Sequence, residues 1–346
     1  MNTTNDTSDP EQTLPNGHEA RRFRRLLQTE TQSFPADTAN RLTAALQSLS
    51  RIMPRQTGSE ADVWETAKEL REIAATSPPV MEFYVKLLQE LPGYSPTTSQ
   101  VCQGVIEAFG LLGQKLDRLL VPVTEALAAH LKCVPSEATE SLRRLSWAHP
   151  EAVQQALYGQ LIKSPWLWDQ AAWLLREMLP GRVNVTGQWL ESDYPGVRAA
   201  GIVYSAMINP SHEAVVNMVK DAMVDPNELI RCAAVEGAFH LPTHADVRAL
   251  LLHAMHAPER SVLLICAQNI RANAPWCAAL LPELFEVLRQ HEFSLLRANV
   301  ARGLGLLGEG GVSAIPALMI AANDCDRSVR SAAKGAIERI VSCSTR

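Results

Sequence analysis

The chain has 346 residues, a formal net charge of −5 and an aromatic content of 5%. With 32 Lys plus Arg against 37 Asp plus Glu, it lacks the overall positive field that nucleic-acid-binding proteins use to attract phosphates. Its seven cysteines are odd in number and contain no Cys-x-x-Cys pair. This argues against a disulfide framework and against a thiolate zinc site.

The opening residues are polar, and no apolar segment of the kind found in secretory signals follows them. No apolar run approaches the roughly 20 residues that a membrane-spanning helix requires. We therefore expect a cytoplasmic protein without a transmembrane segment.

Residues 1–36 are expected to form a flexible tail, because polar residues, Pro and Gly dominate its first part. The second part of this tail contains a basic segment, in which four arginines surround Phe23: Arg21, Arg22, Arg24 and Arg25. Two interpretations of this segment stay open. It is either a short amphipathic helix that docks on an acidic partner or membrane surface, or a solvated segment beside the fold.

Residues 37–346 are expected to form a single array of stacked helix pairs. The first two predicted helices, 37–52 and 59–75, would shield the open end of the stack, as terminal repeats must. The Pro78-Pro79 pair ends the second helix. The predicted parts of the array are capping helices (37–79), divergent repeats (80–192) and well-formed repeats (193–346).

The most individual stretch lies within the divergent repeats and holds five of the seven tryptophans. Trp and Arg are enriched at binding hot spots. Trp166 and Trp168 are two residues apart, about 200° around a helix, so only one of them is expected to face the core. Trp173, among alanines and leucines, is expected to be a core residue. The candidate partner-binding residues are Arg143, Arg144, Trp147, Trp166, Trp168, Arg176 and Trp189.

From residue 193 onward an apolar-Arg pair recurs. Its arginines are Arg198, Arg231, Arg297 and Arg330, with separations of 33, 66 and 33 residues. The missing member falls at Leu264, whose neighbours keep the apolar and small pattern, so we expect a degenerate repeat there and not a break. Small residues after each pair allow neighbouring helices to approach closely. The second helices of the pairs are predicted at 213–224, 245–257, 277–289 and 312–322.

These residues resemble the HEAT-repeat family in its compact bacterial form. The segment from Asp324 through Val329-Arg330 matches the family pattern best, and the segment from Asp225 through Ile230-Arg231 is next. The resemblance implies an all-α, right-handed superhelix of helix pairs. It also implies a structural ladder of Asp and Arg side chains between repeats, here Asp193, Arg198, Asp225, Arg231, Arg297, Asp324 and Arg330.

Motifs for catalysis and metal binding were sought and set aside. His253 and His256 offer only two ligands at i, i+3, fewer than a zinc site needs. Trp189 and Asp193 resemble a pair used by HEAT-like DNA glycosylases, but one pair without a basic surround is weak support. The phycobilin lyases, which act on tetrapyrroles, are resembled only in the repeat itself. We expect no catalytic centre, no cofactor and no metal site.

The sequence therefore predicts a protein-binding scaffold or adaptor that uses the concave face of a helical-repeat superhelix. The alternative is a groove-type enzyme or binder that acts on nucleic acid or a tetrapyrrole. The helices expected to line the concave face begin near Val101, Glu137, Pro165, Val197, Ile230, Leu263, Leu296 and Val329.

Overall fold

The computed structural model describes residues 15–51, 59–91, 96–112, 116, 118–178, 186–242 and 245–344. Within these ranges every regular element is a helix, which confirms the all-α prediction. None of the described helices is long and apolar enough to cross a membrane.

The chain divides into two compact units. Unit 1 comprises residues 1–170 and 177–183, and unit 2 comprises residues 171–176 and 184–346. The division runs through one helix, α9 (Trp168–Glu177), in the stretch where the sequence repeat is most divergent.

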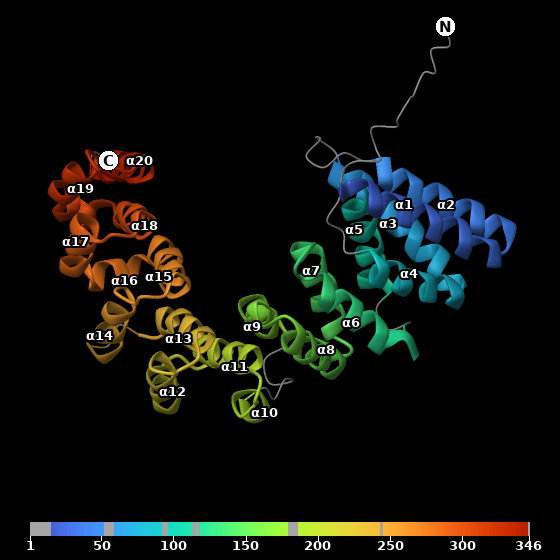
Figure 1. Ribbon diagram of the computed structural model, residues 1–346, viewed down its shortest axis with the longest axis horizontal. Coiled ribbons are helices and arrows are strands. Elements are labelled where there is room, and N and C mark those ends of the chain that lie inside the picture. Colours follow the sequence, from blue (N-terminus) through green and yellow to red (C-terminus); the bar gives the residue numbers. More distant parts are fainter. Residues whose placement is uncertain are drawn as a thin grey trace, which may run out of the picture. The chain divides into compact units, whose positions relative to one another are not determined.

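Unit 1 is built from two rows of helices. In one row α3 packs on α5 and α5 on α7, and in the other α4 packs on α6 and α6 on α8 (Figure 1). The helices are α1 (Pro15–Glu30), α2 (Ala36–Arg51), α3 (Ser59–Thr76), α4 (Pro78–Glu90), α5 (Pro96–Leu112), α6 (Leu120–His130), α7 (Pro135–Ser146) and α8 (Pro150–Lys163), with short 3-10 helices at Thr31–Ser33 and Pro165–Leu167.

Unit 2 repeats the same arrangement. Its first row runs through α11, α13, α15, α18 and α20, each packed on the next, while α12 packs on α14 and α17 on α19 in the second row (Figure 1). The helices are α10 (Thr186–Leu190), α11 (Pro195–Ile208), α12 (Glu213–Met223), α13 (Glu228–His240), α14 (Ala245–Ala254), α15 (Arg260–Ala272), α16 (Ala274–Ala279), α17 (Leu281–Gln290), α18 (Ser294–Gly305), α19 (Ile315–Ala321) and α20 (Arg327–Ser344), with the 3-10 helix η5 (Gly308–Ala314). The predicted second helices correspond to α12, α14, α16 with α17, and η5 with α19.

Proline marks the starts of many helices, because the first turn of a helix needs no backbone N–H donor. Prolines occupy the first or second position of α4, α7, α8, α11, α16, α17 and α19. Other starts are capped by side chains. In α13 the Asn227 side chain accepts a hydrogen bond from the Leu229 N–H at 3.0 Å.

The small residues of unit 2 sit where helices approach most closely. A Cβ atom at Gly303 would lie 2.6 Å from the Ile270 carbonyl oxygen of α15, and one at Gly305 would lie 2.9 Å from the Ala336 Cα of α20. Since real Cβ atoms do not approach other atoms so closely, these two glycines allow α18 to contact both neighbours along its backbone.

The amino-terminal basic segment is helical and belongs to α1. Phe23, Leu26 and Leu27 are buried, and the Arg22 Nε lies 3.3 Å from a carboxylate oxygen of Glu90. The part of the predicted flexible tail from Pro15 to Glu30 is therefore a helix, and it packs through Phe23, Leu26 and Leu27 because these apolar side chains fall on one face. Residues 1–14 lie outside the described part of the chain.

Candidate functional site

The arginine of each apolar-Arg pair binds the loop that precedes its own helix. In each case the guanidinium donates to the carbonyl oxygen six residues upstream: Arg198 to Ser192 (2.8 Å), Arg231 to Asp225 (2.6 Å), Arg330 to Asp324 (2.8 Å) and Arg297 to His291. Arg231, Arg297 and Arg330 also donate to the carbonyl five residues upstream. The recurring arginine thus fastens the turn between successive helix pairs.

Two of these arginines also reach the next repeat. Arg297 binds both carboxylate oxygens of Asp324 at 2.9 Å, and the two side chains are only 10% and 12% exposed. The hydrogen bond from Arg297 holds the pKa of the Asp324 carboxyl below its usual value. Arg231 bridges instead to Glu259, at 2.5 Å. The fold is that of a HEAT-like α-solenoid.

Two other residues of the predicted ladder are placed differently. The Asp225 side chain accepts from the Asn227 N–H at 2.7 Å and so shapes its own loop, while Asp193 is exposed in the loop before α11. Arg231 has Glu259 as its acidic partner, which lies outside the predicted set.

Searches with the chain match solved structures at low similarity. The human deoxyhypusine hydroxylase in complex with glycerol is 14% identical over 88% of this chain and 97% of its own, with a TM-score of 0.33. Kap121p is 12% identical over 97% of this chain and 42% of its own (TM-score 0.40), and YIBA_ECOLI is 13% identical over 91% and 95% (TM-score 0.35). No protein-family model and no curated protein matches the sequence. Scores this low carry nothing about activity, ligand or partner.

The tryptophans of the candidate stretch separate into surface and core. Trp166 is 59% exposed and Trp147 54%, whereas Trp168 is 3% exposed and Trp189 is fully buried. The HEAT-like stack therefore uses Trp168 and Trp189 as core residues, and the prediction that places them on a binding surface is corrected. Trp189 fits because α10 packs on α11 at Gly201, where an added Cβ would lie 3.2 Å from the Trp189 Cβ.

Trp173 differs from its prediction in the opposite sense, since it is expected in the core and lies at the surface. Its ring is 43% exposed, with the Arg176 guanidinium 5.0 Å from the ring centroid and His240 edge-on at 5.8 Å. The surrounding Ala and Leu residues belong to the opposite face of α9. Arg176 thus forms a cation–π contact within unit 2.

The candidate arginines of unit 1 are held by neighbouring side chains. Arg143 and Arg144 both bind Glu140, at 2.7 Å and 2.8 Å, and the Arg143 hydrogen bond lowers the pKa of Glu140. The Arg144 guanidinium also lies 5.4 Å from the centroid of the Trp64 ring. Both guanidinium groups thus share the Glu140 carboxylate, and Glu177 also acts electrostatically on Arg143.

A groove on the first-row helices of unit 2 was missed at the sequence level. We call it the arginine groove. It has a volume of about 410 Å³ and is lined by Arg271, Arg302, Leu306, Ser331, Ala332, Gly335, Ala336 and Arg339. Three guanidinium groups and no carboxylate line it. A Cβ atom at Gly335 would meet nothing within 4 Å, so the groove is open above that residue.

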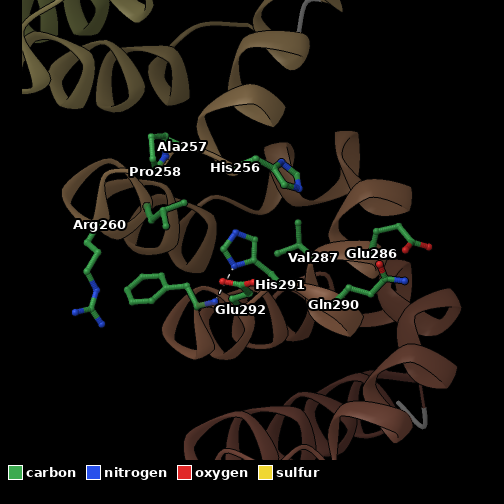
Figure 2. Close-up of a pocket in the computed structure, with 11 residues that line it drawn as sticks. His256, Ala257, Pro258, Arg260, Glu286, Val287, Gln290, His291 and Glu292 are labelled. Carbon is green, nitrogen blue, oxygen red and sulfur yellow. Dashed lines mark hydrogen bonds between the residues drawn. The ribbon is translucent and has the colours of Figure 1, made fainter.

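A second cavity of unit 2, of about 680 Å³, lies at the degenerate repeat (Figure 2). We call it the gap pocket. It is lined by His256, Ala257, Pro258, Arg260, Leu263, Glu286, Val287, Gln290, His291, Glu292 and Phe293. Leu263 lines it and lies next to Leu264, which replaces the repeated arginine; the sequence shows this replacement but not the cavity beside it.

His256, one of the two histidines considered as metal ligands, is engaged in other contacts. The His256 Nδ1 donates a hydrogen bond to the Leu252 carbonyl oxygen at 2.9 Å, and the His256 ring lies 5.8 Å from that of His291. In the described part of the chain no three His, Cys, Asp or Glu side chains are grouped to hold a metal ion.

Proposed function

We propose that this protein is a non-catalytic scaffold that binds a protein partner on the first-row helices of unit 2, with an acidic segment of the partner in the arginine groove. The observation that carries the proposal is the convergence of Arg271, Arg302 and Arg339 on one groove without a lining carboxylate. Such a groove stands out in a chain whose net charge is −5.

The chemistry of the groove favours carboxylates. Guanidinium groups that share a cavity repel one another, so an anion between them is stabilised by all three at once. The planar fork of arginine matches the two oxygens of a carboxylate. The floor of Ala332, Gly335 and Ala336 carries no long side chains, so a peptide backbone can approach α20 closely.

Unit 1 offers a second surface of the kind found at protein interfaces. Trp147 and Trp166 are both more than half exposed, and Arg143 and Arg144 lie in the last turn of α7, which Trp147 follows. Large exposed aromatic rings contribute binding energy when a partner covers them. This supports a scaffold that uses more than one contact region.

The arginine groove is tested with a fluorescent eight-residue peptide of Asp and Glu, titrated by anisotropy. We expect the Arg302→Ala, Arg339→Ala double variant to bind at least tenfold more weakly than wild type. The matched control is Arg289→Ala, because that arginine is exposed and paired with Glu286 outside the groove. Equal affinity of wild type and double variant would overturn the proposal. Tighter binding of a single-stranded oligonucleotide of equal charge would favour the nucleic-acid alternative.

The surface of unit 1 that carries the exposed Trp147 and Trp166 is tested by affinity capture from a lysate with quantitative mass spectrometry. Trp166→Ala should reduce captured partners while leaving the unfolding midpoint within about 2 °C of wild type, because an exposed ring contributes little to folding. Trp166 is substituted alone and not together with Trp168, because Trp168→Ala would remove a buried ring and cost about 3–5 kcal/mol of stability. Capture that is unchanged by Trp166→Ala would exclude this surface.

A further inference from the structure

The gap pocket occupies the place in the stack where one recurring arginine is absent. Arg231, in the preceding repeat, donates to the carbonyls at 225 and 226 and bridges to Glu259, which is 28 residues further along the chain. The equivalent position in the next repeat is Leu264, whose apolar side chain has no group to donate. The Pro258 carbonyl of this repeat therefore lacks the side-chain donor that its counterpart at 225 has, while the Glu259 carbonyl accepts from the Leu263 N–H at 3.2 Å.

Those acceptors follow from the 33-residue period. The carbonyls equivalent to those of 225 and 226 belong to Pro258 and Glu259, and the carboxylate equivalent to Glu259 is that of Glu292. Pro258 and Glu292 both line the gap pocket, from the loop before α15 and the loop before α18 respectively. The cavity thus lies between the two groups that an arginine would join in an intact repeat.

The walls of the pocket suit the flat, weakly hydrated guanidinium group. The His291 ring is neutral in this arrangement: its Nδ1 accepts from the Phe293 N–H at 3.0 Å, its Nε2 donates to the Met255 carbonyl at 2.8 Å, and burial lowers its pKa. The ring of His256 lies beside it. Guanidinium groups stack on aromatic faces of this kind. Leu263 and Val287 offer apolar contact for the methylene chain of an arginine.

The charges around the pocket leave Glu292 available to a cation. Glu286 is paired with Arg289 at 2.7 Å. Arg260, the positive group of the lining, has its guanidinium 5.7 Å from the centroid of the Phe293 ring, and in Figure 2 it extends away from Glu292. An entering guanidinium therefore meets the Glu292 carboxylate, backbone carbonyl oxygens and the neutral ring of His291.

We propose that the gap pocket receives an arginine side chain of a protein partner, which supplies from outside the guanidinium that Leu264 lacks. The volume of about 680 Å³ admits the side chain together with flanking backbone, and it falls within the roughly 300–1,000 Å³ of typical ligand pockets. The gap pocket is a different site from the arginine groove, and it would bind a cationic group where the groove would bind an anionic one. The proposal rests on the proposed function only in that the partner is a protein.

The probe is a five-residue peptide with a central arginine and blocked ends, compared with the same peptide carrying citrulline, which has the shape of arginine without its charge. Binding is followed through the ring signals of His256 and His291 in NMR spectra of the full chain. We expect the arginine peptide to shift both signals in wild type and the citrulline peptide to bind at least tenfold more weakly. Absence of any shift with the arginine peptide would overturn the proposal.

Two variants test the register argument directly. Leu264→Arg places a guanidinium in the gap from within the chain and should abolish the peptide-induced shifts, whereas Leu264→Met keeps an apolar residue there and should leave them unchanged. Glu292→Gln should weaken the peptide at least tenfold without filling the cavity. Peptide affinity that is unchanged by Leu264→Arg, in a variant whose helix content equals that of wild type, would overturn the assignment.

The same spectra distinguish this site from the others. The Arg302→Ala, Arg339→Ala double variant should bind the arginine peptide as wild type does, so failure of the acidic-peptide test and failure of this one are separate results. Free L-arginine lacks flanking peptide backbone and should bind more weakly than the peptide. Tighter binding of the free amino acid would overturn the assignment to a protein partner.

Discussion

Two boundaries between repeats of unit 2 differ in the residue at the recurring arginine position. At the boundary of α18 and α20, Arg297 binds Asp324 with two hydrogen bonds and also fastens its own loop. At the boundary of α15 and α18, Leu264 replaces the arginine, yet the helices still pack with Gly303 against the Ile270 carbonyl. Packing of small residues is therefore common to both boundaries, and a side-chain bridge from the recurring position is present at the first of them, which we call the closed boundary, and not at the second, the open boundary.

The largest difference is expected when the bridge is removed from the closed boundary. Arg297→Ala leaves the nearly buried Asp324 carboxylate without its donor and should lower the free energy of unfolding by about 2–3 kcal/mol. Leu264→Ala, at a side chain that is 37% exposed, should cost less than about 1 kcal/mol. Urea unfolding followed by circular dichroism measures both, and equal costs would contradict the comparison.

The pH dependence of the closed boundary sharpens the same contrast. Because the pKa of Asp324 is lowered in the folded state, its contribution to stability is fully present above the unfolded value of about 3.9 and is lost as the pH falls through the lower folded value. The stability difference between wild type and Asp324→Asn should be constant from about pH 5 to 7 and shrink below about pH 4. A difference that grows on acidification would show that Asp324 is not stabilised as its carboxylate.

Closing the open boundary should give a smaller, positive effect. Leu264→Arg is expected to raise the free energy of unfolding by about 0.5–1.5 kcal/mol, because its guanidinium meets the Pro258 and Glu259 carbonyls and the Glu292 carboxylate. Combined with Glu292→Gln, the gain should fall to less than half. Thermal unfolding of the two variants and of Leu264→Met provides the measurement.

Chemical labelling of thiols compares the two boundaries without changing any residue. Cys325 is exposed in the closed boundary beside Asp324, whereas Cys266 and Cys277 are buried in the degenerate repeat. Burial raises the pKa of the Cys277 thiol to about 12, so almost no thiolate is present at pH 8. A disulfide reagent should modify Cys325 and the exposed Cys343 at least a hundredfold faster than the two buried thiols, as peptide mass mapping over time would show.

The helices of unit 2 could be predicted from the sequence because their apolar and small residues recur with the 33-residue period. Leu264 did not interrupt the prediction of α15, and the structure agrees, since Val262, Leu263 and Cys266 still face the core. The fold thus depends on a pattern that survives the loss of one member.

The candidate sites were less predictable because their residues do not share the register of the repeat. Arg271, Arg302 and Arg339 stand 7, 5 and 9 residues after the recurring position, so no period brings them together. Trp189 and Trp173 exchanged their expected environments because α9 and α10 are short, and helical spacing over so few turns does not settle which face is buried. Only tertiary packing decides such positions.

Asp324 connects two helices at once: its side chain accepts from Arg297 of α18, while its carbonyl oxygen accepts from Arg330 of α20. Under mechanical load, peeling the last helix from the end of the stack must break this linked set together. The boundary at Leu264 has no equivalent set, so a pulled chain is expected to separate there at lower force, and the array would come apart in blocks rather than one helix at a time.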